Sequence, residues 1–200
     1  MAKVTARRNL ARTKHLTVLE KDVEGPGGTI TWEGVERHHP DGVIVSDIVA
    51  VFGVTADGMV PLVEQFRPQL DARVLELPAG LCDAGETVEA AARREFLEET
   101  GYIAERLIPL PPMPECSGLT NCRIHIFLAK NVRKAPGDRD HREGSERILE
   151  LEVVMLPVEG LSRAILAYAI ATGNLVDYKI TGAKDMYHDV YWDLVIGGKP

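Results

Sequence analysis

The sequence predicts a mixed α/β (α+β) fold in which a small antiparallel β unit precedes a larger domain. Runs rich in β-branched residues recur between turn signals, which is typical of strands. Two alanine-containing segments, near residues 90 and 165, have the composition and ends of helices. With 200 residues and 45% apolar composition, the chain can form one domain with an appended element.

The appended element is expected to comprise residues 1–42. Residues 16–23 and 28–38 favour two short strands, separated by the turn-rich stretch GPGG. Residues 39–42, with Pro and Gly, mark a break in the pattern. We therefore place the boundary near residue 42, with the main domain over 43–200.

Strands and helices alternate in the main domain. Residues 43–54 and 59–66 favour strands joined by a hairpin turn, and 124–129 and 149–156 are further strand candidates. We expect helices over 87–100 and 158–172, ended by Gly101 and Gly173. The polar segment 134–147, rich in Pro and Gly, is typical of a mobile loop.

Composition restricts the partners. A net charge of −7 and a pI near 5.4 argue against nucleic acid as the main partner. Cys82, Cys116 and Cys122 have no metal-site spacing and are odd in number, which favours a reduced, cytoplasmic compartment. The basic N-terminus precedes no apolar stretch, so we expect no secretory signal. The most apolar stretch, 165–176, is too short to span a membrane.

Residues 80–102 hold the strongest signal, the pattern G-x5-E-x7-R-E-U-x-E-E-x-G-U, with U a bulky apolar residue. Glu95 and Glu99 lie one helical turn apart, and Glu98 flanks the same edge, so their charges repel unless a cation compensates. Mg²⁺ suits such carboxylates together with phosphate oxygens, which favours metal-assisted hydrolysis of a phosphate compound. A solvated acidic face is the alternative. The specified positions are Gly80, Glu86, Arg94, Glu95, Glu98, Glu99 and Gly101, with Phe96 and Tyr102 in the apolar slots.

Glu86 and Arg94 favour a second, structural interaction. Glu86 precedes the predicted helix and Arg94 lies two turns into it. An ion pair between them could hold the preceding loop against the helix. An ordinary surface arginine is the alternative reading of Arg94.

The whole pattern resembles the Nudix box, and every defining position is met. The resemblance implies a loop–helix–loop on an α/β/α sandwich with a mixed sheet. It implies hydrolysis of nucleoside diphosphates linked to a further group, with Mg²⁺ (or Mn²⁺) bound by Glu95, Glu98 and Glu99. Glu86, Arg94 and Glu98 are expected among the residues that support catalysis.

Segments outside the box are similar to one branch of this family, the ADP-ribose pyrophosphatases. They are TWEGVER at 31–37, PLVEQFRP at 61–68, LELPAG at 75–80, GLT at 118–120 and HIFLA at 125–129. The resemblance implies that Trp32 stacks on adenine, that Arg37 and Arg67 reach the diphosphate, and that the Ala79 carbonyl joins the metal shell. Aromatic stacking and bidentate arginine contacts suit these roles.

Each of these roles has a structural alternative. Trp32 could belong to a sheet core, Arg67 to a structural ion pair, and Arg37 to a solvated strand end. Asn121 and Cys122 stand where relatives often have an acidic residue, so a contact there is in doubt. The general base is expected on the 134–147 loop, with Glu146 preferred and Glu143 and Glu150 as rivals.

The sequence thus predicts Mg²⁺-dependent hydrolysis of ADP-ribose or a related ADP-sugar to AMP and a sugar phosphate. One alternative is another nucleoside diphosphate sugar, such as GDP-mannose, and a less favoured one is a non-catalytic nucleotide-sensing module. Relatives form homodimers in which the N-terminal unit completes the neighbour's site, and residues 1–42 have little core of their own. We therefore expect a homodimer, with Trp32 serving its own or the opposite subunit.

Overall fold

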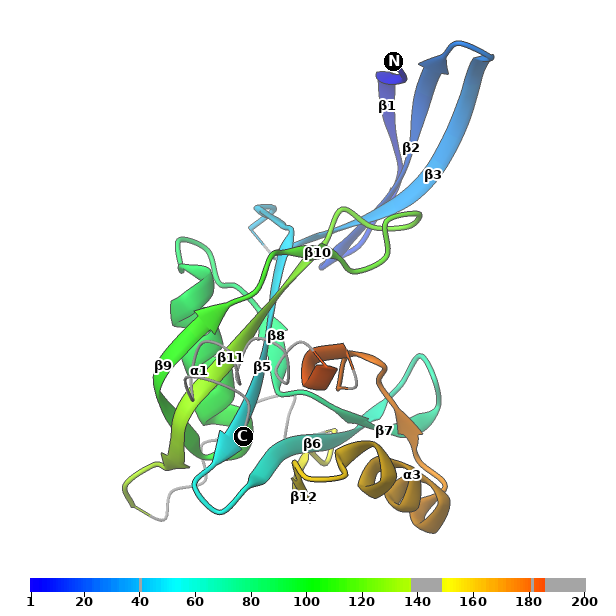
Figure 1. The fold of residues 1–200 in the computed structure, drawn as a ribbon. Coiled ribbons are helices and arrows are strands. Elements are labelled where there is room, and N and C mark those ends of the chain that lie inside the picture. The colour runs from blue at the N-terminus through cyan, green and yellow to red at the C-terminus, as the bar shows by residue number, and fades with distance from the viewer. Residues whose placement is uncertain (40, 138–148, 181, 186–200) are drawn as a thin grey trace.

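The strands form three sheets in the computed structural model, which describes residues 1–39, 41–137, 149–180 and 182–185. One sheet projects from the molecule, and the other two build its body (Figure 1). Glu143 and Glu146 lie outside the described residues, as does most of the predicted mobile loop.

The projecting sheet, hereafter the arm, consists of β1 (Lys3–Arg12), β2 (Leu16–Gly25) and β3 (Gly28–His38). All pairs are antiparallel, and Gly28 opposes Gly25 at the tip with a φ of 118° that favours glycine. A short β4 (Ile44–Val45) pairs with the end of β3 and leads into the body. The strands predicted over 16–23 and 28–38 are confirmed.

The second sheet is mixed, as predicted. Its order is β10-β11-β5-β8, with β9 also pairing to β11. The central pair, β5 and β11, is parallel, whereas β8 and β9 are antiparallel to their neighbours. Its strands are β5 (Asp47–Thr55), β8 (Ala79–Leu81), β9 (Tyr102–Pro109), β10 (Met113–Pro114) and β11 (Arg123–Lys134).

The third sheet has the order β12-β6-β7-β13. Its strands are β6 (Met59–Arg67), β7 (Ala72–Glu76), β12 (Glu152–Pro157) and β13 (Leu175–Val176), and α3 (Leu161–Thr172) contacts β12 and β13. Among the described ranges, neither α3 nor any other helix is both long and apolar enough to cross a bilayer.

Alternate side chains of β5 enter two cores, because successive strand residues point to opposite faces. Phe52 packs with Leu62 and Ile126 in a core that α3 also enters through Leu161. Val49 belongs to the second core, whose residues pack on α1 (Val88–Thr100). Helices therefore cover both sides of the two sheets, which confirms the predicted sandwich.

Local signals at the ends of α1 act as expected. The Thr87 hydroxyl accepts a hydrogen bond from the Ala90 N–H at 3.2 Å, and so caps the helix. Gly101, at φ 72°, ends it, and its N–H donates to the Leu97 carbonyl. The second helix begins at Leu161, later than the predicted residue 158, and ends before Gly173 as expected.

Several strand predictions need correction. The strand expected over 43–54 is two strands that break at Ser46, and the one expected from residue 149 begins at Glu152. Leu149 and Glu150 form a turn in which Glu150 has a φ of 53°. Strands β1, β7, β8 and β9 were not expected from the sequence.

Candidate active site

Gly80 on β8 brings the sheet against the carboxylate helix. A Cβ atom at Gly80 would lie 2.1 Å from the Glu95 carboxyl carbon, far inside any allowed contact. Glu95 is only 8% exposed, so its side chain is buried rather than surrounded by solvent. Glycine at this position is therefore required for the backbone to approach the carboxylate.

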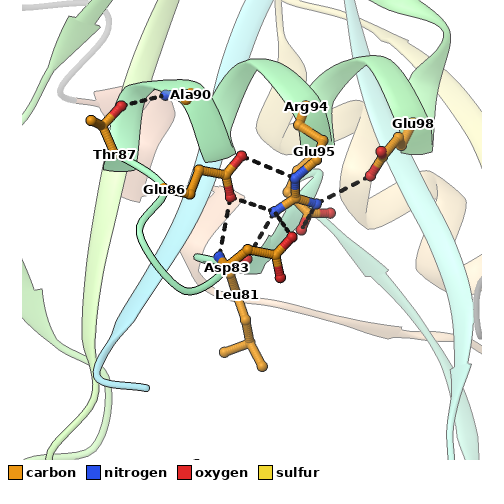
Figure 2. Close-up of polar contacts among 8 residues, drawn as sticks. All are labelled: Leu81, Asp83, Glu86, Thr87, Ala90, Arg94, Glu95 and Glu98. Atoms are coloured by element: carbon orange, nitrogen blue, oxygen red, sulfur yellow. Dashed lines mark hydrogen bonds and ion pairs between the residues drawn. The ribbon is translucent and has the colours of Figure 1, made fainter. Parts of the chain in front are cut away.

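Arg94 lies at the centre of a cluster of carboxylates (Figure 2). Its Nε and Nη2 donate to the two oxygens of Glu86 at 3.1 and 2.9 Å, and Nη2 also donates to the Leu81 carbonyl at 3.0 Å. The Glu86–Arg94 ion pair expected from the sequence is confirmed. It joins the loop before α1 to the helix, and hydrogen bonding to Arg94 lowers the pKa of Glu86.

The same guanidinium offsets the repulsion along α1. Arg94 Nη1 lies 2.7 Å from Glu95 Oε1 and 3.2 Å from Glu98 Oε2. The pKa of Arg94 is raised mainly by its hydrogen bonding to Glu86, and the negative charge of Glu95 raises it further. Arg94 is thus a fixed counter-charge, and it orients Glu95 through the contact with Oε1.

A cleft of about 570 Å³ opens over β8 and the carboxylate helix. Glu95 and Glu99 line it together with the backbone of Ala79 and Gly80. The Ala79 N–H donates to Glu99 Oε2 at 2.8 Å, which fixes that side chain against β8. Glu98 does not line this cleft, and its carboxylate accepts a hydrogen bond from Arg94.

The donor set of the cleft fits a hard divalent cation. The two carboxylates supply oxygen atoms, the ligand type that Mg²⁺ and Mn²⁺ prefer, and the Ala79 carbonyl stays a predicted ligand. Within the described ranges, no three acidic, histidine or cysteine side chains already converge as a metal cluster. The structure therefore brings Glu95, Glu99 and Ala79 together, whereas the full ligand set with Glu98 stays a prediction.

Two arginines, Arg37 and Arg67, also line the cleft. Arg67 on β6 is held by Glu76 through two hydrogen bonds of 2.8 and 2.5 Å, so the structural ion pair foreseen as an alternative is present. Arg37 lies at the end of β3, and its Nε is buried with no hydrogen-bond partner among the described residues. An unsatisfied buried donor of this kind suits an anionic ligand.

His38 is a cleft residue that the sequence did not single out. It is buried, and its Nδ1 lies 3.0 Å from the His39 carbonyl oxygen, which can only accept. Nδ1 therefore carries a proton, and no partner within the described part of the chain reaches Nε2. His38 and His39 adjoin a turn, and His38 also lines the cleft.

Trp32 lies apart from this cleft. It is 52% exposed on the arm, so it is not a core residue. Its Nε1 donates to the Gly118 carbonyl at 2.9 Å, and the ring borders a separate pocket of about 190 Å³ formed with Leu119 and Thr120. The structure thus does not bring Trp32 and the carboxylates of one chain into a single cavity.

The remaining predicted positions are less central. Cys122 is buried, and this burial raises the pKa of its thiol. Glu150 is bound through its carboxylate and its carbonyl by Arg73, at 3.2 and 3.1 Å, and does not line the cleft.

A second branch of the cleft contains residues that the sequence analysis missed. It measures about 460 Å³ and shares Arg37, Arg67 and the Ala79–Leu81 strand with the main cleft. No local pattern marks its residues, because tertiary folding brings them together from distant segments. Its own polar residues are Gln69, Glu76, Glu115, Asp177 and Lys179.

Comparison with known proteins gives consistent matches. A family model described as NUDIX domain matches residues 46–171. ADP-ribose pyrophosphatase of Bacillus subtilis is 29% identical over 88% of this chain and 91% of that protein. ADP-sugar pyrophosphatase of Mus musculus is 35% identical over 77% of this chain and 72% of that protein. A crystal structure of an ADP compounds hydrolase matches the fold with a TM-score of 0.68 at 20% identity, covering 95% of this chain and 94% of that chain.

Proposed function

Because the chain belongs to the NUDIX domain family, we propose that it hydrolyses the diphosphate bond of ADP-ribose or a related ADP-sugar. The products are AMP and a sugar phosphate. Relatives named ADP-ribose pyrophosphatase and ADP-sugar pyrophosphatase support this substrate class.

One observation carries the proposal: carboxylates and arginines line the same cleft. Glu95 and Glu99 come from α1, whereas Arg37 and Arg67 come from β3 and β6. A diphosphate bound in this cleft would meet carboxylates that can hold a cation and arginine side chains that can bind its oxygens. Arg67 is already paired with Glu76, so Arg37 supplies the more available positive charge.

Each residue has a defined part in the proposed reaction. Glu95 and Glu99 would hold Mg²⁺ (or Mn²⁺), which would neutralise charge on the diphosphate and favour attack by water. Arg94 keeps Glu95 oriented, and the Ala79 N–H keeps Glu99 oriented. Glu86 holds Arg94 in turn. Glu146, outside the described residues, is the proposed general base, with Glu143 and Glu150 as rivals.

We also propose a homodimer in which residues 1–42 are the dimerisation unit and 43–200 the catalytic domain. Val4, Val23 and Ile30 are cross-strand neighbours in the arm, and Trp32 follows on the same face. Val4, Ile30 and Trp32 are 58%, 56% and 52% exposed, so one face of the arm carries apolar side chains that its own chain leaves in water. We propose that a second subunit covers this face, and that Trp32 serves the cleft of its own or of the opposite subunit.

A cytoplasmic location is proposed from cysteine chemistry. Cys82, Cys116 and Cys122 are all free thiols. Burial raises the pKa of Cys82 to about 11, which keeps it protonated and unreactive.

A substrate panel tests the proposed activity. Purified protein with Mg²⁺ is offered ADP-ribose, other ADP-sugars and GDP-mannose, and the nucleotide products are separated by chromatography. We expect ADP-ribose or another ADP-sugar to give the highest kcat/KM, with AMP as the product. A clear preference for GDP-mannose would replace the proposed substrate, and absence of turnover on every compound would reject the enzymatic proposal.

A further inference from the structure

The second branch of the cleft ends at two residues outside the segment that defines the family. Asp177 and Lys179 follow β13, whereas the family model ends at residue 171. Because β13 pairs with β7, this C-terminal segment is fixed beside the strand that carries Glu76. Sequence distant from the carboxylate helix therefore forms part of the site.

Asp177 holds Lys179 in a defined position. The Asp177 N–H donates to the Leu75 carbonyl at 2.9 Å, which ties the turn to β7. One Asp177 oxygen accepts the Lys179 backbone N–H at 2.8 Å, and the other forms an ion pair with the Lys179 ammonium. The two side chains are 12% and 21% exposed, so the pair is mostly enclosed but open to the branch.

Arg67 joins this pair to the main cleft. The pKa of Arg67 is raised mainly by its hydrogen bonding to Glu76. The negative charges of Glu99 and Asp177 raise it further. Arg67 therefore lies within electrostatic reach of a cleft carboxylate on one side and of Asp177 on the other. A substrate whose diphosphate lies beside Arg67 places its next group in the branch.

The lining of the branch suits a neutral, hydroxylated group. Its three basic and three acidic side chains balance in formal charge, so it offers no excess of positive charge for a phosphate. Lys179 supplies N–H donors, Asp177 and Glu115 supply acceptors, and Ile48, Leu70 and Ile124 form an apolar wall. Adjacent donors and acceptors match neighbouring hydroxyl groups of a sugar.

We propose that Lys179 and Asp177 form a subsite for a ribosyl group of the substrate, an inference that rests on the proposed function. Lys179 donates to a hydroxyl oxygen, while Asp177 and Glu115 accept from hydroxyl groups. This assigns a substrate-binding role to a turn that lies outside the family-defining segment.

The test compares Lys179→Met with Lys184→Met. Lys184 follows in the same C-terminal segment, but its ammonium contacts Ser162 and Asp185 and does not line the branch. For Lys179→Met we expect the KM for ADP-ribose to rise about ten- to a hundredfold, with kcat unchanged within about twofold. Lys184→Met is expected to match the wild type. Should Lys179→Met fail to fold, Lys179→Gln, which keeps a donor, is expected to show the same rise in KM to a smaller extent.

Inhibition by the two halves of the substrate gives a second readout. AMP and ribose 5-phosphate each contain one ribosyl group, and only one group can occupy the branch. In the Lys179 variant we expect one half to inhibit about ten- to a hundredfold more weakly and the other to be unaffected. Equal weakening of both halves, or of neither, overturns the subsite. If the wild type cleaves no ADP-sugar, the proposed function fails first; if it does and both lysine variants behave alike, only the subsite fails.

Discussion

The arm and the carboxylate helix are stabilised in opposite ways. In the arm, β1 is exposed along nearly its whole length, and its ion pairs, such as Arg8 with Glu20 and Asp22, lie at the surface. On the helix, Phe96 is 1% exposed, and Arg94 is surrounded by four carboxylates from the loop and the helix. Surface ion pairs add little stability, whereas removing one partner of an enclosed charge cluster is strongly destabilising because it leaves the other charges uncompensated.

This difference separates the two tasks of the proposed enzyme. The helix and β8 hold the carboxylates that we propose as cation ligands within one chain. The arm carries Trp32, which remains 52% exposed although its indole N–H donates to the Gly118 carbonyl of the same chain. We infer that the metal chemistry belongs to a self-sufficient body, while recognition of the base depends on assembly. The following four changes each act on one of the two regions, and each is paired with a matched control.

Gly80→Ala is expected to have the largest effect. The added methyl group would meet the Glu95 carboxylate, so the helix edge and β8 must separate. A displacement of about 1 Å at a reacting centre can lower kcat by about a hundredfold or more. Gly27→Ala in the arm is the matched control, because its Cβ would meet nothing within 4 Å. Steady-state kinetics give kcat for both variants, and a wild-type kcat for Gly80→Ala would contradict the close approach of β8 to the Glu95 carboxylate.

Arg94→Met should destabilise the body, whereas Arg93→Met should not. Arg94 is 27% exposed and bonds to three glutamates, so its loss leaves their repulsion uncompensated. We expect a loss of about 2 kcal/mol in the free energy of unfolding. Arg93 pairs with Glu89 at the surface, and such pairs contribute about 0–1 kcal/mol. Urea denaturation measures both, and equal losses would show that Arg94 has no special role.

Trp32→Ala addresses the arm. Loss of base stacking is expected to cost about 1–3 kcal/mol of binding, seen as a higher KM, while Thr29→Ala on the opposite face of β3 has no effect.

If Trp32 serves the partner, mixing Trp32→Ala with Glu99→Gln forms heterodimers that contain one intact site. At low substrate concentration the mixture should then exceed the summed activity of the two variants. Activity equal to that sum, or a monomeric mass by light scattering with activity retained, would contradict assembly across the arm.

Acid pH should give the smallest effect. The pKa of Glu86 is lowered from its ordinary value near 4.5 by Arg94, so the ion pair stabilises the fold above that value and is lost as the pH falls through the lower, folded pKa. The difference in Tm between wild type and Glu86→Gln should therefore be constant from about pH 8 to about pH 5 and shrink below it. Glu89→Gln, at an exposed pair, is the control. A difference that shrinks already near neutral pH would exclude a lowered pKa.

Local signals in the sequence predicted much of this molecule. The ends of α1 followed from Thr87 and Gly101, and the Glu86–Arg94 pair followed from spacing along one loop and helix, because both depend on near neighbours. By contrast, β1 was missed because it is exposed and basic and becomes a strand only through pairing with β2.

Tertiary contacts account for the rest of what the sequence could not supply. The Arg67–Glu76 pair depends on the register between β6 and β7. Lys179 reaches the cleft only because β13 pairs with β7, which no local pattern encodes. The position of Trp32 outside the cleft likewise results from the projection of the arm, which Figure 1 shows.

Divalent-cation binding at the carboxylate helix is the central claim, and isothermal titration calorimetry tests it most directly. Mn²⁺ is titrated into the protein in the presence of a non-hydrolysable methylene analogue of ADP-ribose, and the titration is repeated with Glu99→Gln. We expect saturable Mn²⁺ binding to the wild type and binding weakened at least about tenfold in the variant, whose thermal unfolding is otherwise unchanged. No measurable binding to the wild type, or equal affinity in both proteins, would contradict the account.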